Sequence, residues 1–72
     1  MQESELIKRV KKCRDELKEL GLPSPRYFFA LKYKEYNNEN RLNNLYYGKI
    51  ADADFTVKLE AFTRYKITEY NE

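Results

Sequence analysis

The spacing of hydrophobic residues changes along the chain, from a helical period at the start to a two-residue period further on. Near the N-terminus the apolar positions recur every three or four residues, at Leu6, Val10, Cys13, Leu17 and Leu20. This spacing predicts an amphipathic helix over about residues 4–20. Ser4 is a candidate N-cap for it. Gly21, Leu22 and Pro23 are typical of the residues that follow a helix end.

Residues 55–68 show the two-residue period and predict a long strand. One side of it would carry Phe55, Val57 and Leu59, and the intervening residues are mostly polar. This is the pattern of a strand with one buried face. Neither glycine nor proline interrupts the stretch, so we expect this strand to form the floor of the core.

Two further strands are predicted upstream, over residues 26–36 and 41–50. The second alternates weakly, and Gly48 within it invites a bulge. Residues 37–40 and 51–54 have the composition of connecting turns. The sequence therefore predicts a single α+β domain over residues 1–72, with one N-terminal amphipathic helix packed on a three-stranded antiparallel β-meander.

This order of elements resembles the first four elements of a double-stranded-RNA-binding domain. The closing helix of that family, with its basic start, has no counterpart in this sequence. The function of the family is therefore not carried over to this chain.

Composition limits the chemistry that the chain can perform. It has one cysteine, Cys13, and no histidine, so an internal disulfide is excluded and the usual soft metal sites are out of reach. We expect neither a metal site nor a cofactor. Cys13 lies on the apolar helix face, as a small buried hydrophobic residue does. Asp52 and Asp54 are a local carboxylate pair, which a turn explains more simply than catalysis. We predict that the protein is not an enzyme and has no small-molecule substrate.

Charge and hydropathy indicate where the protein works. The 14 basic and 12 acidic residues give a formal net charge of +2, which favours neither strong phosphate attraction nor an acidic mimic. No apolar run approaches the ~20 residues that span a bilayer, and the N-terminus lacks the pattern of a secretory signal. We expect a cytoplasmic protein that does not enter membranes. Its abundant Lys, Asn, Tyr and Ile suit an AT-rich genome or a mobile element.

The candidate interaction residues lie on the sheet face that the helix would leave uncovered. The covered face is assigned Tyr27, Phe29, Leu31, Phe55, Val57 and Leu59. The opposite face then displays aromatic and basic side chains, namely Phe28, Lys32, Lys34, Tyr36, Tyr47, Lys58, Phe62, Arg64 and Lys66. Leaving a phenylalanine in water forfeits roughly 1.5–3 kcal/mol, which a small domain can barely tolerate.

Three interpretations of this face stay open: a solvated surface, a protein interface and a nucleic-acid site. Interface centres are enriched in Tyr, Phe and Arg, and the chain has seven Tyr and four Phe. We favour a non-catalytic protein–protein interaction module that forms a homodimer, comparable to a small phage or prophage regulator or inhibitor that occupies a partner's surface. The alternative is binding of single-stranded nucleic acid through the same face.

Overall fold

The protein is all-helical in the part of the chain that the computed structural model describes, residues 2–72, with side chains described from residue 5 onward. In chain order the elements are α1 (Gln2–Glu19), α2 (Arg26–Lys32), the short 3-10 helix η1 (Lys34–Tyr36), α3 (Glu39–Tyr46) and α4 (Ala53–Asn71). No strand occurs in residues 2–72. The predicted α+β fold with a β-meander is therefore wrong, and the resemblance to a double-stranded-RNA-binding domain falls with it.

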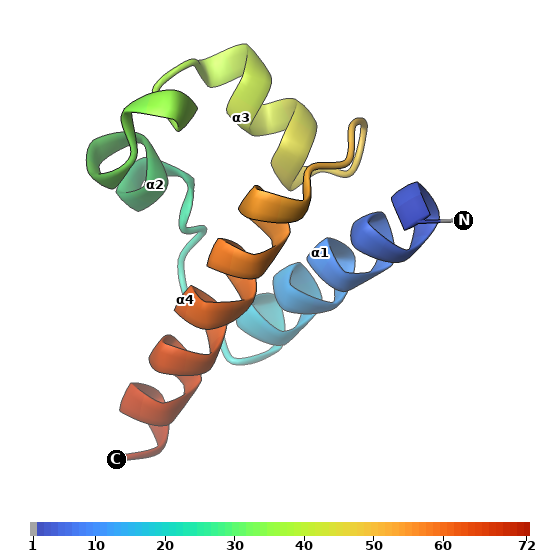
Figure 1. Cartoon of the computed structure of the whole chain (residues 1–72). Helices are drawn as coiled ribbons and strands as arrows, with labels where there is room; N and C mark the ends of the chain where they lie inside the picture. Colours follow the sequence, from blue (N-terminus) through green and yellow to red (C-terminus); the bar gives the residue numbers. More distant parts are fainter. Residues whose placement is uncertain (1) are drawn as a thin grey trace.

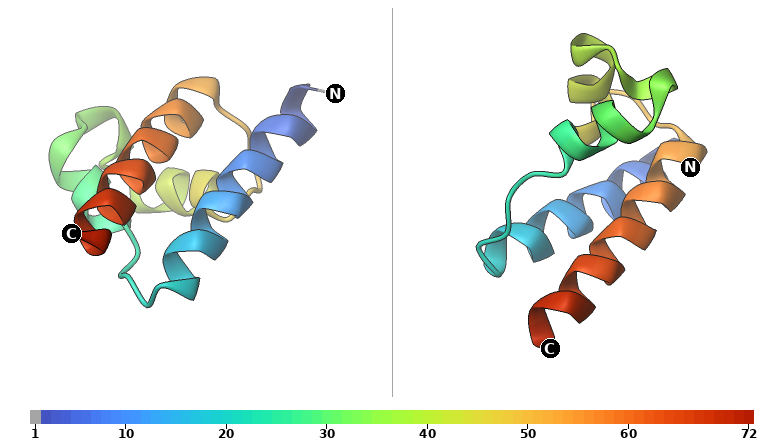
Figure 2. Two further views of the ribbon diagram at one scale, coloured as in Figure 1. Left: turned by 90° about the horizontal axis from the view of Figure 1, so that it is seen from below. Right: turned by 90° about the vertical axis from the view of Figure 1, so that its left-hand side faces the viewer.

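The two long helices, α1 and α4, run in the same direction, and the shorter elements connect them (Figure 1). Parallel neighbours need a crossover, which α2, η1 and α3 provide. The crossover lies over the N-terminal half of α4, on one side of the two long helices (Figure 2). The last turns of α4 extend beyond it (Figure 1). The molecule measures 33 × 28 × 16 Å along its principal axes.

The first helix, α1, agrees with the sequence prediction in its buried face and in its end. Val10, Cys13 and Leu17 are buried. Gly21 has a φ of +73°, and the Leu22 N–H donates to the Leu17 carbonyl at 2.9 Å, as in a Schellman motif. Ser4 is not the N-cap of α1, because the helix begins at Gln2 and Ser4 lies inside it. The side chain of Ser4 lies outside the described residues.

The predicted first strand, residues 26–36, is replaced by α2 and η1. A strand that buried Phe29 would also bury the residues two positions away on either side. Phe29 is 1% exposed, yet Tyr27 and Leu31 are 76% and 69% exposed. This is the burial pattern of a short helix with one face on the core, so the assignment of Tyr27 and Leu31 to the core is wrong.

The predicted second strand, residues 41–50, is mostly α3. The side chain of Asn38 caps this helix by accepting a hydrogen bond from the Arg41 backbone N–H at 3.1 Å. Gly48, where a bulge was expected, has a φ of +78°. Beyond it the Lys49 N–H donates to the carbonyl of Asn44 at 2.8 Å. The segment therefore starts at an asparagine cap and ends at a left-handed glycine, as helices commonly do.

The predicted third strand, residues 55–68, lies within α4. Phe55, Leu59 and Thr63 are spaced by four residues and are buried, whereas Val57 is 57% exposed instead of belonging to the core. The hydroxyl of Thr63 donates to the Leu59 carbonyl at 2.8 Å. This bond satisfies a buried polar group within the helix.

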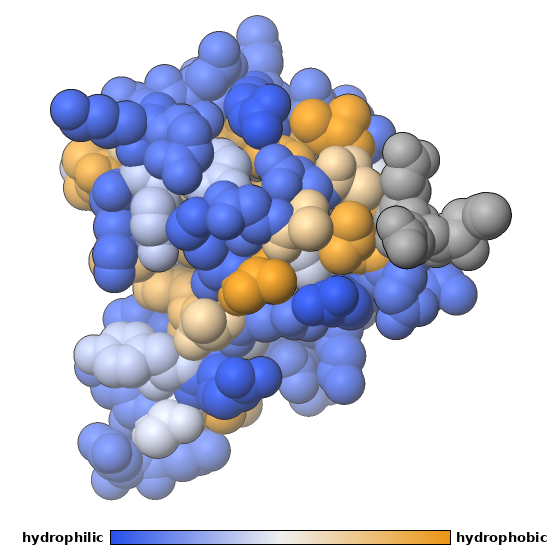
Figure 3. All heavy atoms as spheres, in the orientation of Figure 1, coloured by the Kyte–Doolittle hydropathy of each residue, from blue (hydrophilic) through white to orange (hydrophobic). Residues whose placement is uncertain are grey.

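Aromatic rings fill the core between α4 and the crossover. Phe29, Tyr36 and Phe55 are among the largest fully buried side chains, and burying each contributes about 1.5–3 kcal/mol. Phe62 packs against this cluster but is only partly buried, so it carries the aromatic cluster to the surface. The face in Figure 3 is largely hydrophilic, and one of its apolar patches lies where the α3–α4 connection meets α1.

Candidate interaction surface

Phe28 and Phe62 form an aromatic stack at the surface between α2 and α4. Their ring centroids are 4.7 Å apart, and the ring planes are inclined by 30°. The stack borders the core, because both rings also contact Phe29. Phe28 is nevertheless 41% exposed. Such an open ring surface can receive another apolar or aromatic group.

Two lysines flank this stack. Lys32 Nζ lies 5.5 Å from the ring centroid of Phe28, and Lys66 Nζ lies 5.7 Å from that of Phe62. Both distances fit cation–π contacts. Lys66 also pairs with Glu69 at 3.3 Å, whereas Lys32 forms no ion pair with the residues described. The rim of the stack therefore holds one cation without an ion pair among the described residues, Lys32, and one ion pair, Lys66 with Glu69.

An apolar groove of about 410 Å³ opens beside the stack. It lies between the α1–α2 connection and the C-terminal half of α4. Besides the stack, its walls include Leu22, Pro23, Pro25, Tyr27 and Tyr70, together with the charged side chains of Lys66 and Glu69. The two prolines restrict the backbone dihedral angles of one wall.

Four members of the predicted interaction face come together here: Phe28, Lys32, Phe62 and Lys66. They lie on two neighbouring helices, where the sequence analysis placed them on strands. The surface they form is therefore a stack between α2 and α4 that borders a groove.

Tyr36 does not belong to this surface, and its predicted place on the interaction face is wrong. It is 1% exposed, and its hydroxyl donates to Asp54 Oδ2 at 2.6 Å. Burial, together with this hydrogen bond to a carboxylate, raises the pKa of the Tyr36 phenol well above its ordinary value. Tyr36 is a core residue whose polar atom is satisfied.

Lys58 and Lys34 are the two other lysines of the predicted interaction face, and they differ in whether they form contacts within the protein. The ammonium group of Lys58 bonds to both carboxylate oxygens of Asp54, at 2.7 and 2.6 Å. The hydrogen bond with Asp54 raises the pKa of Lys58. Lys34 lies exposed in η1. Lys58 is therefore engaged within the protein, while Lys34 faces solvent.

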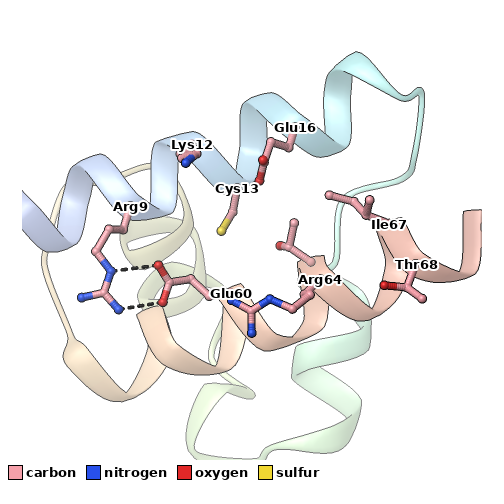
Figure 4. Close-up of a pocket in the computed structure, with 9 residues that line it drawn as sticks. Arg9, Lys12, Cys13, Glu16, Glu60, Arg64, Ile67 and Thr68 are labelled. Atoms are coloured by element: carbon pink, nitrogen blue, oxygen red, sulfur yellow. Dashed lines mark hydrogen bonds and ion pairs between the residues drawn. The ribbon is translucent and has the colours of Figure 1, made fainter. Parts of the chain in front are cut away.

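Tyr47 and Arg64 belong to other parts of the surface. Tyr47 packs edge-to-face on Tyr46, with ring centroids 5.2 Å apart. Arg64 lines a hollow between α1 and α4 (Figure 4). The continuous aromatic and basic face predicted from the sequence is thus divided among separate sites, because the residues lie on helices and not on one sheet.

The hollow between α1 and α4 contains an ion pair and the one cysteine. Arg9 donates to both carboxylate oxygens of Glu60 (Figure 4), and this pairing lowers the pKa of Glu60. Cys13 points into the space between the helices (Figure 4) and is buried. Burial raises the pKa of its thiol, which suits a packed side chain better than a nucleophile.

The carboxylate pair Asp52 and Asp54 forms the start of α4, where the sequence analysis placed a hairpin turn. Asp52 Oδ1 accepts from the Asp54 backbone N–H at 2.9 Å, and Asp52 Oδ2 accepts from Arg41 at 3.1 Å. Both groups are thus engaged in capping and in ion pairs. Within the described part of the chain, no cluster of three or more His, Cys, Asp or Glu could hold a metal ion.

No protein-family model, curated protein or solved structure matches this chain. Among residues 2–72, no helix combines the length and the apolar character needed to cross a membrane. The fold itself is a crossover of short helices on two long parallel ones, with an exposed aromatic stack at its side.

Proposed function

We propose that this protein is a non-catalytic binding module that docks a segment of a protein partner in the groove beside Phe28 and Phe62. The observation that carries the proposal is the exposed stack of these two rings, which continues the aromatic core to the surface. Aromatic side chains in such positions supply most of the binding energy at many protein interfaces.

The cations at the rim favour one kind of partner. Lys32 Nζ lies near the Phe28 ring and Lys66 Nζ near the Phe62 ring, and Lys66 is also paired with Glu69, which lines the groove. A complementary segment places a large apolar side chain against the rings and a carboxylate near Lys32, which forms no ion pair with the described residues. We therefore expect an acidic segment with one apolar anchor.

A second copy of the chain suits this groove less well. Around a two-fold axis a surface patch meets itself, which would bring Lys32 and Lys66 of both copies together. Like charges that face each other in an interface weaken it. The homodimer predicted from the sequence stays a prediction, as do the phage-type regulatory role and the cytoplasmic location.

Single-stranded nucleic acid is the alternative ligand, because an exposed ring flanked by lysines can also hold a stacked base and its phosphates. The division of the predicted face weighs against it. Lys58 is paired with Asp54, and Arg64 lies in the hollow between α1 and α4. A nucleic-acid strand needs a row of available cations to follow its backbone.

Selection of random peptides displayed on phage tests the partner class. We expect the enriched peptides to combine one large apolar residue with nearby Asp or Glu. Phe28→Ala and Lys66→Gln should each weaken binding by at least about tenfold. Val57→Ala truncates another exposed apolar side chain, outside the groove, and should leave binding unchanged. Enrichment of basic peptides, or binding that is indifferent to Phe28→Ala, would overturn the proposal.

Two measurements identify the other occupants. Light scattering from micromolar to near-millimolar protein reports self-association, and a dimer that Phe28→Ala disperses would assign the groove to a second copy. Titration with oligothymidine at several salt concentrations reports nucleic-acid binding. Salt-dependent binding that Phe28→Ala abolishes would assign the stack to bases. Either result would replace the peptide segment as the occupant.

A further inference from the structure

Arginine and tyrosine side chains from three helices meet at a second site, outside the aromatic groove. The guanidinium carbon of Arg14, on α1, lies 5.9 Å from the ring centroid of Tyr46 and 5.5 Å from that of Tyr47, at the end of α3. Arg26, at the start of α2, lies 5.6 and 5.2 Å from the same rings. Two positive charges therefore lie beside one tyrosine pair.

The two arginines differ in their hydrogen bonding. Arg26 donates to Asn43 Oδ1 at 2.7 Å and to Ser24 Oγ at 3.1 Å. Arg14 forms no ion pair with the described residues, and its Nε is buried without a hydrogen-bond partner. A buried donor left without an acceptor costs about 1–3 kcal/mol, and more on a charged group. Because Nε is closed off from solvent, a ligand in the adjoining hollow would meet the terminal nitrogens of the Arg14 guanidinium.

Arg14 borders an open hollow of about 500 Å³ beside the C-terminal end of α1. Lys18, one helical turn after Arg14, also lines it and forms no ion pair with the residues described. Asp15 is the acidic side chain in the lining, and it is already paired with Lys11 at 2.9 Å. Asp15 also interacts with Arg14 and Lys18, and besides the hydrogen bond from Lys11 their positive charges help to lower its pKa. The hollow therefore presents two cations and one carboxylate, and that carboxylate is shared with Lys11.

Two backbone carbonyls at this end of α1 are satisfied within the protein. The carbonyl of Leu17 accepts from the Leu22 N–H at 2.9 Å, and that of Lys18 accepts from the Gly21 N–H at 3.0 Å. These bonds satisfy carbonyls that a helix end otherwise leaves unpaired. Ser24 also lines the hollow, and because its oxygen accepts from Arg26, its own O–H is available to donate.

From this arrangement we propose that the hollow binds a phosphate monoester. A phosphate monoester carries about −1.5 to −2 charges at neutral pH and three acceptor oxygens. These properties match the charges of Arg14 and Lys18 and the hydroxyl of Ser24, whereas a carboxylate has one charge and two oxygens. Tyr47 is 48% exposed in the lining and provides a flat apolar surface for the organic part of the ester.

NMR titration of the arginine side-chain signals tests the proposal. The probes are inorganic phosphate, phosphoserine and phenyl phosphate, each compared with chloride at equal ionic strength. We expect the Nε–H signal of Arg14 to shift saturably with the two esters and not with chloride. Tighter binding of phenyl phosphate would indicate an aryl ester, and tighter binding of phosphoserine an alkyl ester. No saturable shift at tens of millimolar ester would overturn the proposal.

Matched variants separate a specific site from general attraction to a positive protein. Arg14→Gln should weaken ester binding at least tenfold, and Lys18→Gln several-fold. Lys8→Gln removes the same charge from an exposed position of α1 outside the hollow and should leave binding unchanged. If Arg14→Gln does not fold, Arg14→Lys, which keeps the charge but lacks Nε, replaces it. Equal loss in Lys8→Gln and Lys18→Gln would contradict the proposed site.

Discussion

Arg9 and Glu60 join α1 to α4 across 51 positions of the chain through two hydrogen bonds, at 2.8 and 2.6 Å (Figure 4). Parallel bonds between a guanidinium and a carboxylate fix orientation as well as distance. The pair therefore links one turn of α1 to one turn of α4, next to the buried Cys13.

The first prediction concerns stability in acid. The hydrogen bond with Arg9 lowers the pKa of Glu60 below its ordinary value of 4.5. A carboxylate whose pKa is lowered in the folded state stabilises fully above its unfolded pKa, and this contribution is lost as the pH falls through the folded pKa. We expect the urea concentration at the unfolding midpoint to decrease when the pH is lowered below about 4.5. The decrease should be smaller in Glu60→Gln than in the wild type.

The quantity to measure is the difference in urea midpoint between the wild type and Glu60→Gln at each pH. The difference is needed because the pKa values of Asp15 and Asp54 are lowered as well. Those two carboxylates are present in both proteins, so their contribution cancels. Identical pH profiles for the wild type and Glu60→Gln would mean that the ion pair does not contribute.

The second prediction concerns Tyr36 and alkaline pH. Tyr36→Phe removes the hydrogen bond to Asp54, and we expect it to cost about 1–2 kcal/mol at neutral pH. Burial raises the pKa of Tyr36 above its ordinary 10.0, so folding favours the neutral phenol. The contribution of the neutral Tyr36 phenol to the free energy of unfolding is complete at a pH below the pKa of tyrosine in the unfolded chain. It is lost progressively as the pH rises above that pKa. The free-energy difference between wild type and Tyr36→Phe should therefore narrow above pH 10.0, as urea unfolding at several pH values would show. A constant difference would contradict this account.

The later helices were predicted as strands because a helical period and a two-residue strand period place the same key apolar residues on one face. Phe55 and Leu59 are four positions apart, and residues at i and i+4 share a face in a strand and in a helix alike. The residue midway between them distinguishes a strand from a helix. Val57 would be buried in a strand and is exposed in α4. Phe29 and its neighbours Tyr27 and Leu31 show the same difference.

The sequence contains residues that favour helix ends, but the same residue types also favour turns between strands. Asn38 and Asp52 cap helices, and Gly48 ends one, each in a segment that was assigned to a turn or a bulge. Asparagine, aspartate and glycine favour hairpin turns for the same reasons that they favour helix ends. In α1 the end signal followed an unambiguous helical period, so Gly21 was interpreted correctly.

The same coincidence explains which site residues the sequence analysis grouped correctly. Phe28 and Lys32 are four positions apart, as are Phe62 and Lys66, so each pair shares a face in either type of element. The prediction for Tyr36 was wrong because α2 ends before this residue, and the following 3-10 helix η1 places its side chain in the core. The meeting of Arg14 and Arg26 at Tyr46 depends on the packing of three helices, and no local pattern predicts it.

The third prediction compares the glycines at two helix ends. Gly21 and Gly48 both have positive φ, which costs a residue with a side chain about 1–2 kcal/mol. A Cβ added at Gly48 would lie 3.1 Å from Cγ2 of Ile7, whereas at Gly21 nothing lies within 4 Å. We expect Gly48→Ala to lower the free energy of unfolding more than Gly21→Ala does.

Ile7→Ala tests the origin of that extra cost. Introduced together with Gly48→Ala, it should recover part of the difference, because it removes the methyl group that the new Cβ meets. Equal costs for the two glycine substitutions, or no coupling with Ile7→Ala, would show that the backbone conformation alone is responsible.

The fourth prediction tests whether Asp52 starts a helix. Asp52→Ala removes the acceptor for the Asp54 N–H and the ion pair with Arg41, and we expect it to cost about 1 kcal/mol. Asp52→Asn keeps a capping oxygen and should cost less. Asn38→Ala, at the start of α3, is the matched control and should also cost about 1 kcal/mol. Urea unfolding followed by circular dichroism measures all three. Equal losses in Asp52→Ala and Asp52→Asn would assign the effect to the charge, and unchanged stability in both would contradict a helix that begins there.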